Sequence, residues 1–443
     1  MLRLKSIEIR NFRAIEHARL DLDPDLTVLV GENAAGKTAI LDAIAAALSP
    51  LLHGSQPKTS RFVAPKDFRV VGLADPTGDV RREEHISLKV QEHTRGGWEC
   101  DFLLRDGSLR DRVRVEVEGI GPYGLREWLE DDRVEAPIIA SYGADRALPS
   151  APRIRNAQMR RLAGSLGRAG AYDGALESRA VYEEAAEWFE AIENLELRNN
   201  RESGRFYRDR RLDAVRKAVS QLVPELENLR MVGLPPRLMI DARLPGRPAE
   251  SLSVDQLSGG YRAMLSLVID LSRRMADLNP ESNDPLGVGG VVLIDEIDLH
   301  LHPRWQQLVV SGLRSMFPAV QFILTTHSPQ VLSTLEPHNI RNLKWMNGRL
   351  GEGHVPSTSG AESGRLMSEV MGVDERPPAQ ISDFVEFLER YRQLVSLDQW
   401  DAPEAVELFD KLREESPDDP VLGALDLERR RLGAQKRREL SET

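Results

Sequence analysis

The sequence predicts an α/β fold built around one central sheet, and three observations carry this prediction. A strand, a glycine-rich loop and a helix follow one another over residues 26–48. The run GGVVLIDEID at 289–298 is too continuously apolar for a half-exposed strand, which indicates a central strand of a parallel sheet. The run VQFILTTHS at 320–328 has the same character and is expected to be another buried strand.

The first of four expected parts is an N-terminal lobe, residues 1–150. It begins with strands at 2–10 and 26–31 and a helix at 37–48, whose apolar residues recur with a helical period. The segments ISLKVQEH and RVRVEVEG alternate between apolar and polar residues, as half-exposed strands do. We expect them to form an antiparallel sheet inserted after the first helix.

The second expected part, 151–250, is a helical and basic insertion. It contains an amphipathic helix at 178–194 and a basic stretch from Arg198 to Lys217, and it ends in two strands, LRMVGL and RLMIDARL. The remaining two parts are a C-terminal lobe at 251–375, which holds the buried strands named above, and a helical tail at 376–443.

Composition limits the class of protein. Of the 443 residues, 41% are hydrophobic and 29% are charged, with a net charge of −11, which is ordinary for a soluble globular chain. No apolar run reaches the roughly 20 residues of a membrane span, and the single cysteine, Cys100, cannot form an intrachain disulfide, so a cytoplasmic protein is expected. The negative charge argues against a general nucleic-acid coat but leaves room for a local basic patch.

A phosphate-binding loop is predicted directly after the strand at 26–31. Its residues match G-x-x-x-x-G-K-[ST] and have the strand before and the helix after that this motif requires. Backbone N–H groups would cradle the phosphates of ATP, Lys37 would reach the β- and γ-phosphates, and the Thr38 hydroxyl would ligate Mg²⁺. The residues expected to contact the nucleotide are Gly31, Glu32, Asn33, Ala34, Ala35, Gly36, Lys37, Thr38 and Ala39.

Two carboxylates follow the apolar strand VVLI. Ligands of α/β sheets bind at the carboxyl ends of the strands, so Asp295 is expected to hold Mg²⁺, directly or through water. Glu296 is next along the chain and would point to the other side of an extended strand, where it could orient or deprotonate the attacking water. The alternative is a strand that ends in solvated acids, which the phosphate loop in the same chain disfavours.

A second anion site is predicted where the helix 263–274 begins. Ser258, Gly259 and Gly260 lie at the helix start, where a hydroxyl, open backbone N–H groups and the helix dipole would together attract an anion. Because Lys37 already belongs to one complete cradle, this second cradle would serve the γ-phosphate held by a partner copy. The alternative is a plain helix N-cap.

The order of four motifs, GENAAGKT, QLSGGYR, VVLIDEIDLHLHP and TTHSP, resembles the ATPase heads of ABC proteins, in the branch of RecF, the SMC-like proteins and the OLD nucleases. The resemblance implies an ABC-type P-loop NTPase head, a mixed sheet with an antiparallel lobe, a helical insertion and a helical tail. It implies that Ser258 and Gly260 act in trans on the ATP of a homodimer partner, or of a neighbour in a higher even oligomer. It further implies that His327 senses the γ-phosphate, with Lys37 and Glu296 in catalysis, and it adds Arg13 to the nucleotide-binding residues.

The sequence departs from the family pattern in places. Ala34 stands where many relatives have glycine, Tyr261 follows the signature where transporters have Gln or Glu, and His302 replaces the Asp of the loop that joins two subunits. No clear glutamine marks the usual glutamine loop. The segment 142–146 is the candidate for that region.

The tail suggests a biological role. Residues 380–443 carry a helical stripe that includes Phe384, Phe387, Leu388 and Leu394. With the compact head, this tail resembles the ATPase subunits of bacterial antiphage modules of the Septu type, some of which accompany retrons, where the ATPase pairs with a separate HNH nuclease. The resemblance therefore implies a docking surface for such a nuclease, although a helical pair packed on its own domain is the simpler alternative.

Two rival functions stay open from the sequence. One is a RecF-like repair or recombination ATPase that clamps duplex DNA, and the other is a scaffold that holds ATP and scarcely hydrolyses it. The basic stretch from Arg198 to Lys217 could contact DNA, helped by the two aromatic residues Phe206 and Tyr207 inside it. A solvated helix face is the default reading of the same stretch.

Overall fold

The computed structural model divides the chain into two compact units, residues 1–371 and 372–443, and each is described by itself. The structure describes residues 2–52, 63–72, 81–94, 96–105, 108–115, 134–144, 168–177, 182–204, 206–243, 246–373, 376, 378 and 382–442. Asp145 and Arg146, from the candidate glutamine-loop segment, lie outside the described residues.

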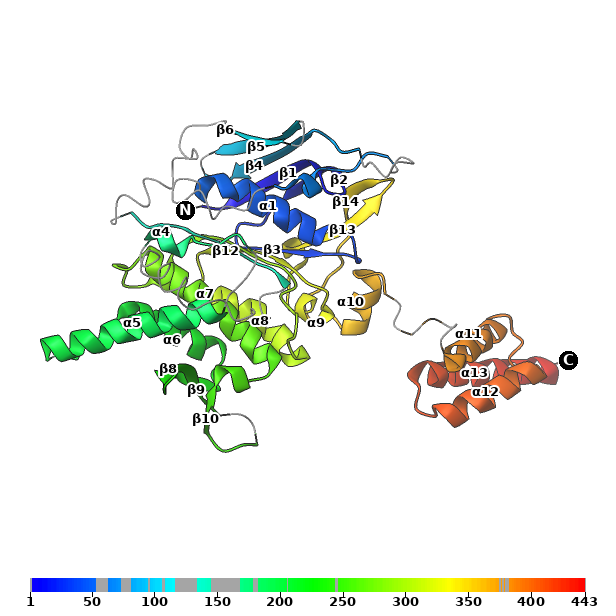
Figure 1. Ribbon diagram of the computed structural model, residues 1–443. Coiled ribbons are helices and arrows are strands. Elements are labelled where there is room, and N and C mark those ends of the chain that lie inside the picture. The colour runs from blue at the N-terminus through cyan, green and yellow to red at the C-terminus, as the bar shows by residue number, and fades with distance from the viewer. Residues whose placement is uncertain are drawn as a thin grey trace. The chain divides into compact units, whose positions relative to one another are not determined.

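The core of unit 1 is a six-stranded sheet in the order β14-β13-β3-β12-β11-β7 (Figure 1). All neighbouring strands are parallel except the edge pair of β13 and β14. Every residue of β3, β7, β11 and β12 is buried, as the continuous apolar runs of the sequence predict. The strands are β3 (Leu26–Val30), β7 (Ile138–Tyr142), β11 (Gly290–Ile294), β12 (Val320–Thr325), β13 (Ile340–Met346) and β14 (Arg349–Gly353).

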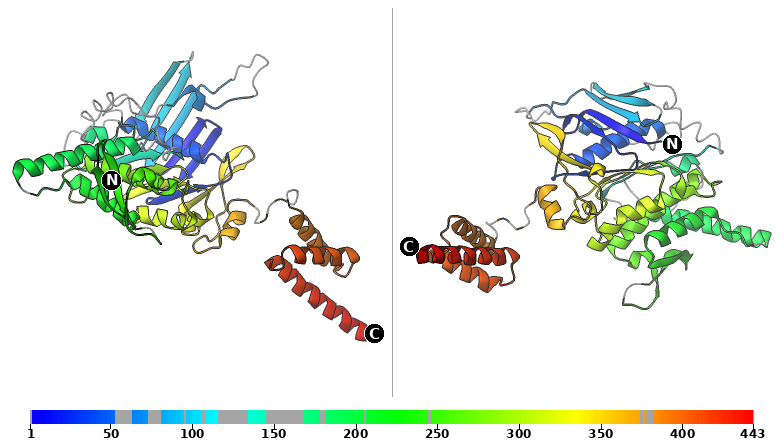
Figure 2. Two further views of the ribbon diagram at one scale, coloured as in Figure 1. Left: turned by 60° about the horizontal axis from the view of Figure 1, so that its bottom comes forward. Right: turned by 180° about the vertical axis from the view of Figure 1, so that it is seen from behind.

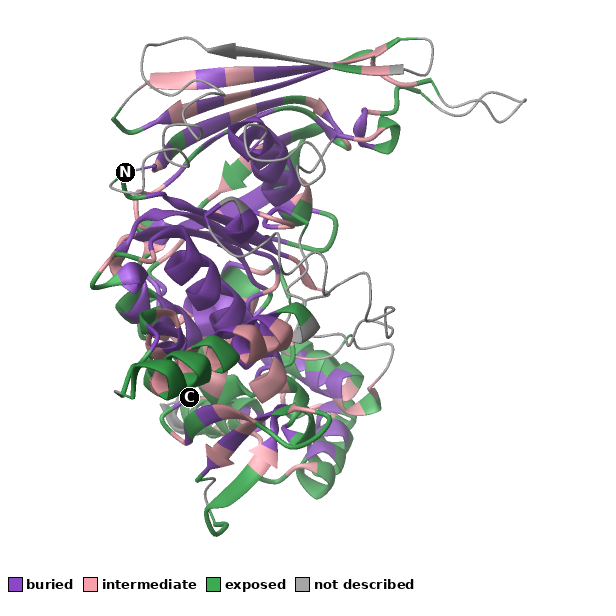
Figure 3. Ribbon diagram, turned by 60° about the vertical axis from the view of Figure 1, so that its left-hand side comes forward, coloured by how far each residue is buried: buried purple, intermediate pink, exposed green. Residues whose placement is uncertain are grey.

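A second, antiparallel sheet has the order β2-β1-β4-β5-β6. It consists of β1 (Leu4–Phe12), β2 (Ile15–Asp21), β4 (His85–Glu92), β5 (Gly96–Arg105) and β6 (Ser108–Val115). Helix α1 (Lys37–Leu52) lies between this sheet and the six-stranded one and is buried along most of its length (Figures 1 and 3). The indole Nε1 of Trp98 donates a hydrogen bond of 2.7 Å to the carbonyl of Ala47, which fixes α1 against β5. The predicted α/β head with an antiparallel lobe is confirmed.

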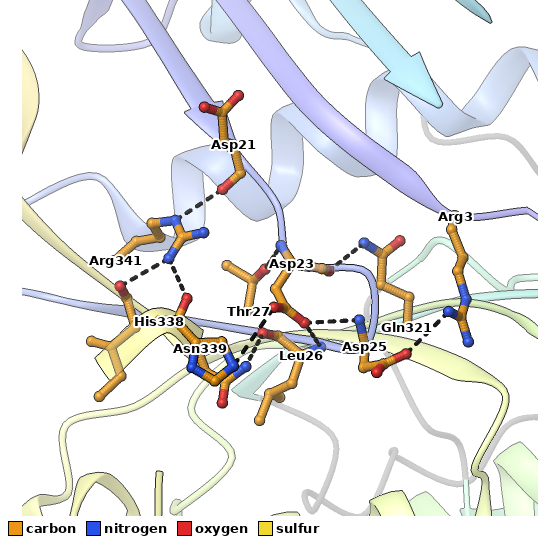
Figure 4. A network of polar contacts seen from close by, with 11 residues as sticks. Arg3, Asp21, Asp23, Asp25, Leu26, Thr27, Gln321, His338, Asn339 and Arg341 are labelled. Atoms are coloured by element: carbon orange, nitrogen blue, oxygen red, sulfur yellow. Dashed lines mark hydrogen bonds and ion pairs between the residues drawn. The ribbon is translucent and has the colours of Figure 1, made fainter. Parts of the chain in front are cut away.

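One buried glutamine, Gln321, joins the two sheets, and its contact with Asp23 is seen in Figure 4. Gln321 on β12 is fully buried, and its side-chain oxygen accepts the Leu4 amide at 2.7 Å. Its amide nitrogen donates to the Leu4 carbonyl at 2.7 Å and to the Asp23 carbonyl at 2.8 Å. Because buried polar groups are costly when left unpaired, this side chain sets how the antiparallel lobe attaches to the core.

The inserted part of unit 1 contains helices and a third sheet. Its elements are α4 (Arg168–Ala171), α5 (Tyr182–Ser203), α6 (Arg210–Leu222), β8 (Leu226–Val232), β9 (Arg237–Ala242) and β10 (Glu250–Ser253), followed by η3 (Val254–Gln256) and α7 (Gly259–Leu278). The strands pair in the order β10-β9-β8. The sequence pattern predicts β8 and β9 but not β10, which is only four residues long. The long helix α7 starts four residues earlier than the expected 263.

The rest of unit 1 follows β11. It comprises α8 (Pro303–Met316), α9 (Pro329–Leu332) and α10 (Ser363–Glu369), with 3-10 turns η1 (Pro65–Asp67), η4 (Pro285–Gly287) and η5 (Pro337–Asn339) elsewhere in the unit. Helices α7 and α8 lie on the face of the six-stranded sheet opposite α1 (Figure 1). Among the described residues, no helix combines the length and the apolar character that crossing a bilayer requires.

Unit 2 is built from three helices, α11 (Asp383–Ser396), α12 (Pro403–Glu415) and α13 (Pro420–Glu442). Its own core contains Leu388 and Leu394 from the predicted stripe, and Phe384 and Phe387 pack against that core while partly buried. The stripe therefore stabilises unit 2 from within. Other apolar side chains of the unit are exposed instead, including Leu397 at 65% and Leu427 at 68%.

Candidate functional site

The loop between β3 and α1 has the backbone of a phosphate cradle. Gly31 and Gly36 adopt φ values of 147° and 95°, which suit glycine. A Cβ at Gly31 would lie 2.6 Å from the carbonyl oxygen of Leu343, so the close approach of β13 also requires glycine there. Ala34 has a φ of 65° without being glycine, and its carbonyl accepts a hydrogen bond of 3.2 Å from Trp345 Nε1.

Lys37, the first residue of α1, is buried and points back into this loop. Its Nζ donates to the carbonyl oxygens of Gly31 at 2.8 Å and Glu32 at 2.9 Å. Burial lowers the pKa of Lys37, and the negative charges of Asp295, Glu296 and Asp298 act in the opposite direction. The ammonium therefore lies between the loop and the acidic strand end, where a phosphate chain would meet it.

The acidic strand end meets the phosphate loop through Asp295. The Thr38 hydroxyl donates to one carboxylate oxygen of Asp295 at 2.9 Å, and the Thr325 hydroxyl donates to the other at 2.5 Å. These residues follow or end β3, β11 and β12, three neighbouring strands, so the sheet brings them to one edge. A hydroxyl and a carboxylate oxygen this close form a donor set that suits Mg²⁺.

Glu296 is not part of the strand. Strand β11 ends at Ile294, and Glu296 adopts a left-handed φ of 48°. The expectation that strand alternation sets its direction is therefore wrong. Instead, its amide donates to the Thr325 hydroxyl at 2.7 Å, which ties the residue to the end of β12. The side chain is half-buried beside Asp295.

The signature segment forms the open end of a 20-residue helix. Ser258 is the N-cap of α7, but its side chain makes no capping hydrogen bond. Ser258 and Gly259 are exposed, and a Cβ at Gly259 would meet nothing within 4 Å. A Cβ at Gly260 would lie 2.7 Å from the carbonyl of His300, so this glycine lets the helix start pack on the loop after β11.

Tyr261 stands where transporters have Gln or Glu, and its side chain has a packing role. Its ring meets Trp305 of α8 edge to face, with centroids 5.7 Å apart. His302 caps the same helix, because its Nδ1 accepts the Arg304 amide at 3.3 Å. Tyr261 therefore packs the start of α7 against α8, whereas His302 stabilises the first turn of α8.

Asp298 is a residue of this site that the sequence reasoning missed. One of its carboxylate oxygens accepts the Thr326 hydroxyl at 2.5 Å and the His327 amide at 3.2 Å. Gln306 bonds to the Asp298 carbonyl at 3.3 Å and accepts the Ser328 hydroxyl at 2.8 Å. The exposed side chain of His327 is thus carried by a loop fixed to the turn after β11. The sequence signal that could have identified Asp298 is its place as the third acidic residue of the segment IDEID at 294–298.

In this structure the Arg13 side chain forms ion pairs within unit 1. Its guanidinium pairs with Asp42 of α1 at 2.7 Å and Asp67 of η1 at 2.8 Å. It thereby joins the antiparallel lobe to α1. A contact between Arg13 and the nucleotide stays a prediction.

Tyr142, at the end of β7, connects the site to the signature helix. Its carbonyl accepts the Asp295 amide at 2.8 Å, and its hydroxyl bonds to Asp270 of α7 at 2.8 Å. Asp270 also pairs with Arg274 at 2.7 Å and Arg273 at 2.5 Å. Burial opposes ionisation of Asp270, but the two arginines hold the pKa of this carboxyl at about 2, so a charged, buried cluster links β7 to α7.

A phosphate loop, an acidic strand end and a separate signature helix on one α/β head define an ABC-type P-loop ATPase. The chain belongs to the family described as "AAA domain, putative AbiEii toxin, Type IV TA system", whose model matches residues 26–333. The sequence-based assignment to the RecF/SMC/OLD-like branch, most like the Septu and retron ATPases, is confirmed.

Individual relatives agree with this assignment. The chain is 28% identical to the "Retron Ec83 probable ATPase" of Escherichia coli, over 96% of this chain and 86% of that protein. It is 26% identical to the "Septu protein PtuA" of Bacillus mycoides, over 89% of this chain and 47% of that protein. Among solved structures, an SMC head bound to the C-terminal winged-helix domain of ScpA matches 79% of this chain and 96% of its own, with a TM-score of 0.46 and 16% identity.

Proposed function

We propose that the protein binds ATP with Mg²⁺ and hydrolyses it to ADP and phosphate. The proposal rests on one observation. Hydrogen bonds join Thr38 and Thr325 to Asp295 at the sheet edge, beside the buried side chain of Lys37. This arrangement brings a cation and oxygen ligands together at one edge of the sheet, as binding of a phosphate chain with Mg²⁺ requires. The protein is expected to act in the cytoplasm.

Each residue then has a defined task. Lys37 exchanges its bonds to the loop carbonyls for the β- and γ-phosphates, and the loop amides hold the remaining oxygens. Thr38 and Asp295 would hold Mg²⁺, which would supply positive charge to the phosphates when bound. Glu296 orients or deprotonates the water that attacks in line, and His327 contacts the γ-phosphate.

We further propose that the site is completed by a second copy in a head-to-head homodimer. Within one chain, the open helix start at Ser258–Gly259 makes no capping bond with its hydroxyl and has free space around Gly259. In the dimer, this helix start faces the γ-phosphate bound by the partner, where its N–H groups and dipole stabilise the anion. Hydrolysis removes that anion and opens the dimer.

Asp298 is proposed as a positioning residue for His327. Replacing Asp298 by Ala removes the acceptor for both the Thr326 hydroxyl and the His327 amide. We expect kcat to fall about tenfold, the rate equivalent of about 1.4 kcal/mol, which is the scale of one hydrogen bond, while KM for ATP stays unchanged. Steady-state ATP turnover measures both constants.

The conservative variant makes this test specific. The amide oxygen of Asp298→Asn can accept the same two bonds, so this variant should recover most of the turnover. Asp255→Asn, at an exposed position of η3, is the matched control. An Asn variant as impaired as the Ala variant, or an effect confined to KM, would contradict the positioning role.

The biological role we propose is control of a partner HNH nuclease in bacterial antiphage defence. The resemblance to Septu and retron ATPases supports it, as do the names of the relatives. Residues 380–443 are the proposed docking region, since unit 2 has its own core and exposes apolar side chains such as Leu397 and Leu427. The alternative is a RecF-like ATPase that clamps duplex DNA without a partner.

Removing residues 380–443 should separate docking from ATP turnover. Unit 1 keeps its own core, so the truncated chain is expected to turn over ATP normally but to lose its nuclease partner. Co-purification from cells that carry the native neighbouring genes, followed by mass spectrometry and an ATPase assay, measures both properties.

A finer variant of the full chain keeps unit 2 folded. Leu397→Glu with Leu427→Glu should abolish co-purification, while Arg392→Glu, at an exposed position of α11, should not. A full chain that purifies without a nuclease, but retains duplex DNA only when ATP is present, would instead favour the RecF-like alternative.

A further inference from the structure

The turn that joins α5 to α6 carries an unusual set of exposed side chains. We define the α5–α6 tip as the described residues 197–204 and 206–210. Phe206 is 82% exposed and Tyr207 is 42% exposed, whereas aromatic rings of this size are normally buried. In Figures 1 and 2 the C-terminal end of α5 projects away from the rest of unit 1, so the tip is open to a large ligand.

The backbone of the tip is held in place. Asn200 of α5 donates from its amide nitrogen to the Tyr207 carbonyl at 3.1 Å and accepts the Tyr207 amide in return. The Asp209 amide donates to Glu196 at 2.7 Å, and Asp209 caps α6. These bonds fix both ends of the segment that carries the aromatic pair, so little ordering entropy is lost on binding.

The charge of the region is opposite to that of the chain. Residues 198–217 hold eight basic and three acidic side chains, a net charge of +5 against −11 overall. Arg211 and Arg216 are used inside unit 1, in ion pairs with Asp209 and with Glu193. Among the described residues of the stretch, the exposed basic ones are Arg198, Arg201, Arg208, Arg210 and Lys217, and the acidic Glu202 is exposed too.

The aromatic and basic groups act together at one point. The Arg208 guanidinium lies over the Phe206 ring, 5.4 Å from its centroid. A cation on one aromatic face, with the ring otherwise in water, resembles a platform on which a planar base could stack while the arginines neutralise the adjoining phosphates.

We propose that the α5–α6 tip binds single-stranded nucleic acid. Unpaired bases can leave their own stack and pack on Phe206 and Tyr207, and this burial removes apolar area from water. In a duplex the bases are already stacked, so contacts would be limited to the arginines and the aromatic rings would stay exposed. The proposal concerns a surface separate from the ATP site and does not depend on turnover.

Fluorescence anisotropy with the full chain tests this proposal. A labelled oligothymidine is the probe, with oligouridine and a DNA duplex as the other arms. The double change Phe206→Ala and Tyr207→Ala should weaken single-strand binding about tenfold or more, the effect of losing one stacked base. The control is Leu234→Ala, an apolar residue of the β8–β9 turn that is 99% exposed.

A salt series separates the arginines from the rings. Arg198→Glu with Arg201→Glu should weaken binding and flatten the dependence of log affinity on log salt. Arg237→Glu with Arg247→Glu, exposed and outside the tip, carries the same charge change and should leave the affinity of the tip largely intact. Unchanged ATP turnover in every variant shows that the head is folded.

Binding of either DNA or RNA single strands that requires Phe206 and Tyr207 would support the proposal, and the comparison of oligothymidine with oligouridine identifies the preferred backbone. The proposal would be overturned by absence of single-strand binding at low salt. Tighter binding of duplex than of single strands, insensitive to loss of the two rings, would also overturn it.

Discussion

Replacing Glu296 by Gln is expected to abolish phosphate release and to trap a dimer with ATP. The change keeps the size of the side chain but removes the group that orients or deprotonates the attacking water. Loss of general base catalysis costs about 10²- to 10⁴-fold in rate. Lys37, Thr38 and Asp295 are untouched, so ATP should still bind and still hold two heads together.

Two measurements on the same sample check this expectation. Phosphate release gives the rate, and light scattering coupled to gel filtration gives the mass with ATP and without it. Glu281→Gln, at an exposed position of unit 1, is the matched control. A Glu296→Gln protein that releases phosphate at the normal rate would show that another group serves as the base.

The second large effect is expected from Ser258→Arg. Ser258 is exposed at the start of α7, so an arginine should be accepted by the isolated chain. In the proposed dimer it would meet the nucleotide site of the partner, and its length would prevent closure. We expect loss of ATP-dependent dimerisation and at least about a hundredfold loss of turnover, the scale on which misplaced catalytic groups act.

Binding of ATP to the separate chain should persist in this variant, because the phosphate loop is on the other lobe. A fluorescent ATP analogue measures that binding. Ser315→Arg adds the same side chain at another exposed position, near the end of α8 and the amino end of β12. This variant should keep both dimerisation and turnover. Dimerisation and turnover that survive Ser258→Arg would contradict the shared site.

The central part of the fold was predictable because burial leaves a direct trace in sequence. Strands buried on both faces are continuously apolar, as in VVLI before Asp295 and in QFIL before Thr325. The phosphate loop was predictable because its glycines answer local needs, such as the positive φ values of Gly31 and Gly36. The four-residue strand β10 has no comparable signal, since its pairing with β9 depends on tertiary context.

The parts of the site that escaped prediction depend on distant contacts or on irregular backbone. The direction of Glu296 follows from a left-handed φ after the strand has ended, which a simple alternation rule cannot express. The carboxylate of Asp298 accepts its hydrogen bonds from Thr326 and His327, which lie far along the chain. Likewise, the basic stretch divides into internal ion pairs and an exposed tip only when α5 and α6 are packed.

The measurement that tests the shared site most directly is a mixing experiment. Lys37→Ala removes the phosphate-loop cation, and Ser258→Asp places a short carboxylate against the γ-phosphate, which it repels without the length that prevents closure, so each protein alone should be nearly inactive. A mixed dimer holds one intact composite site, because Lys37 of one chain meets Ser258 of the other. With equal amounts and random pairing, turnover should recover to about a quarter of the unmodified level, since half the dimers carry one working site of two. A mixture no more active than its two components would contradict the account.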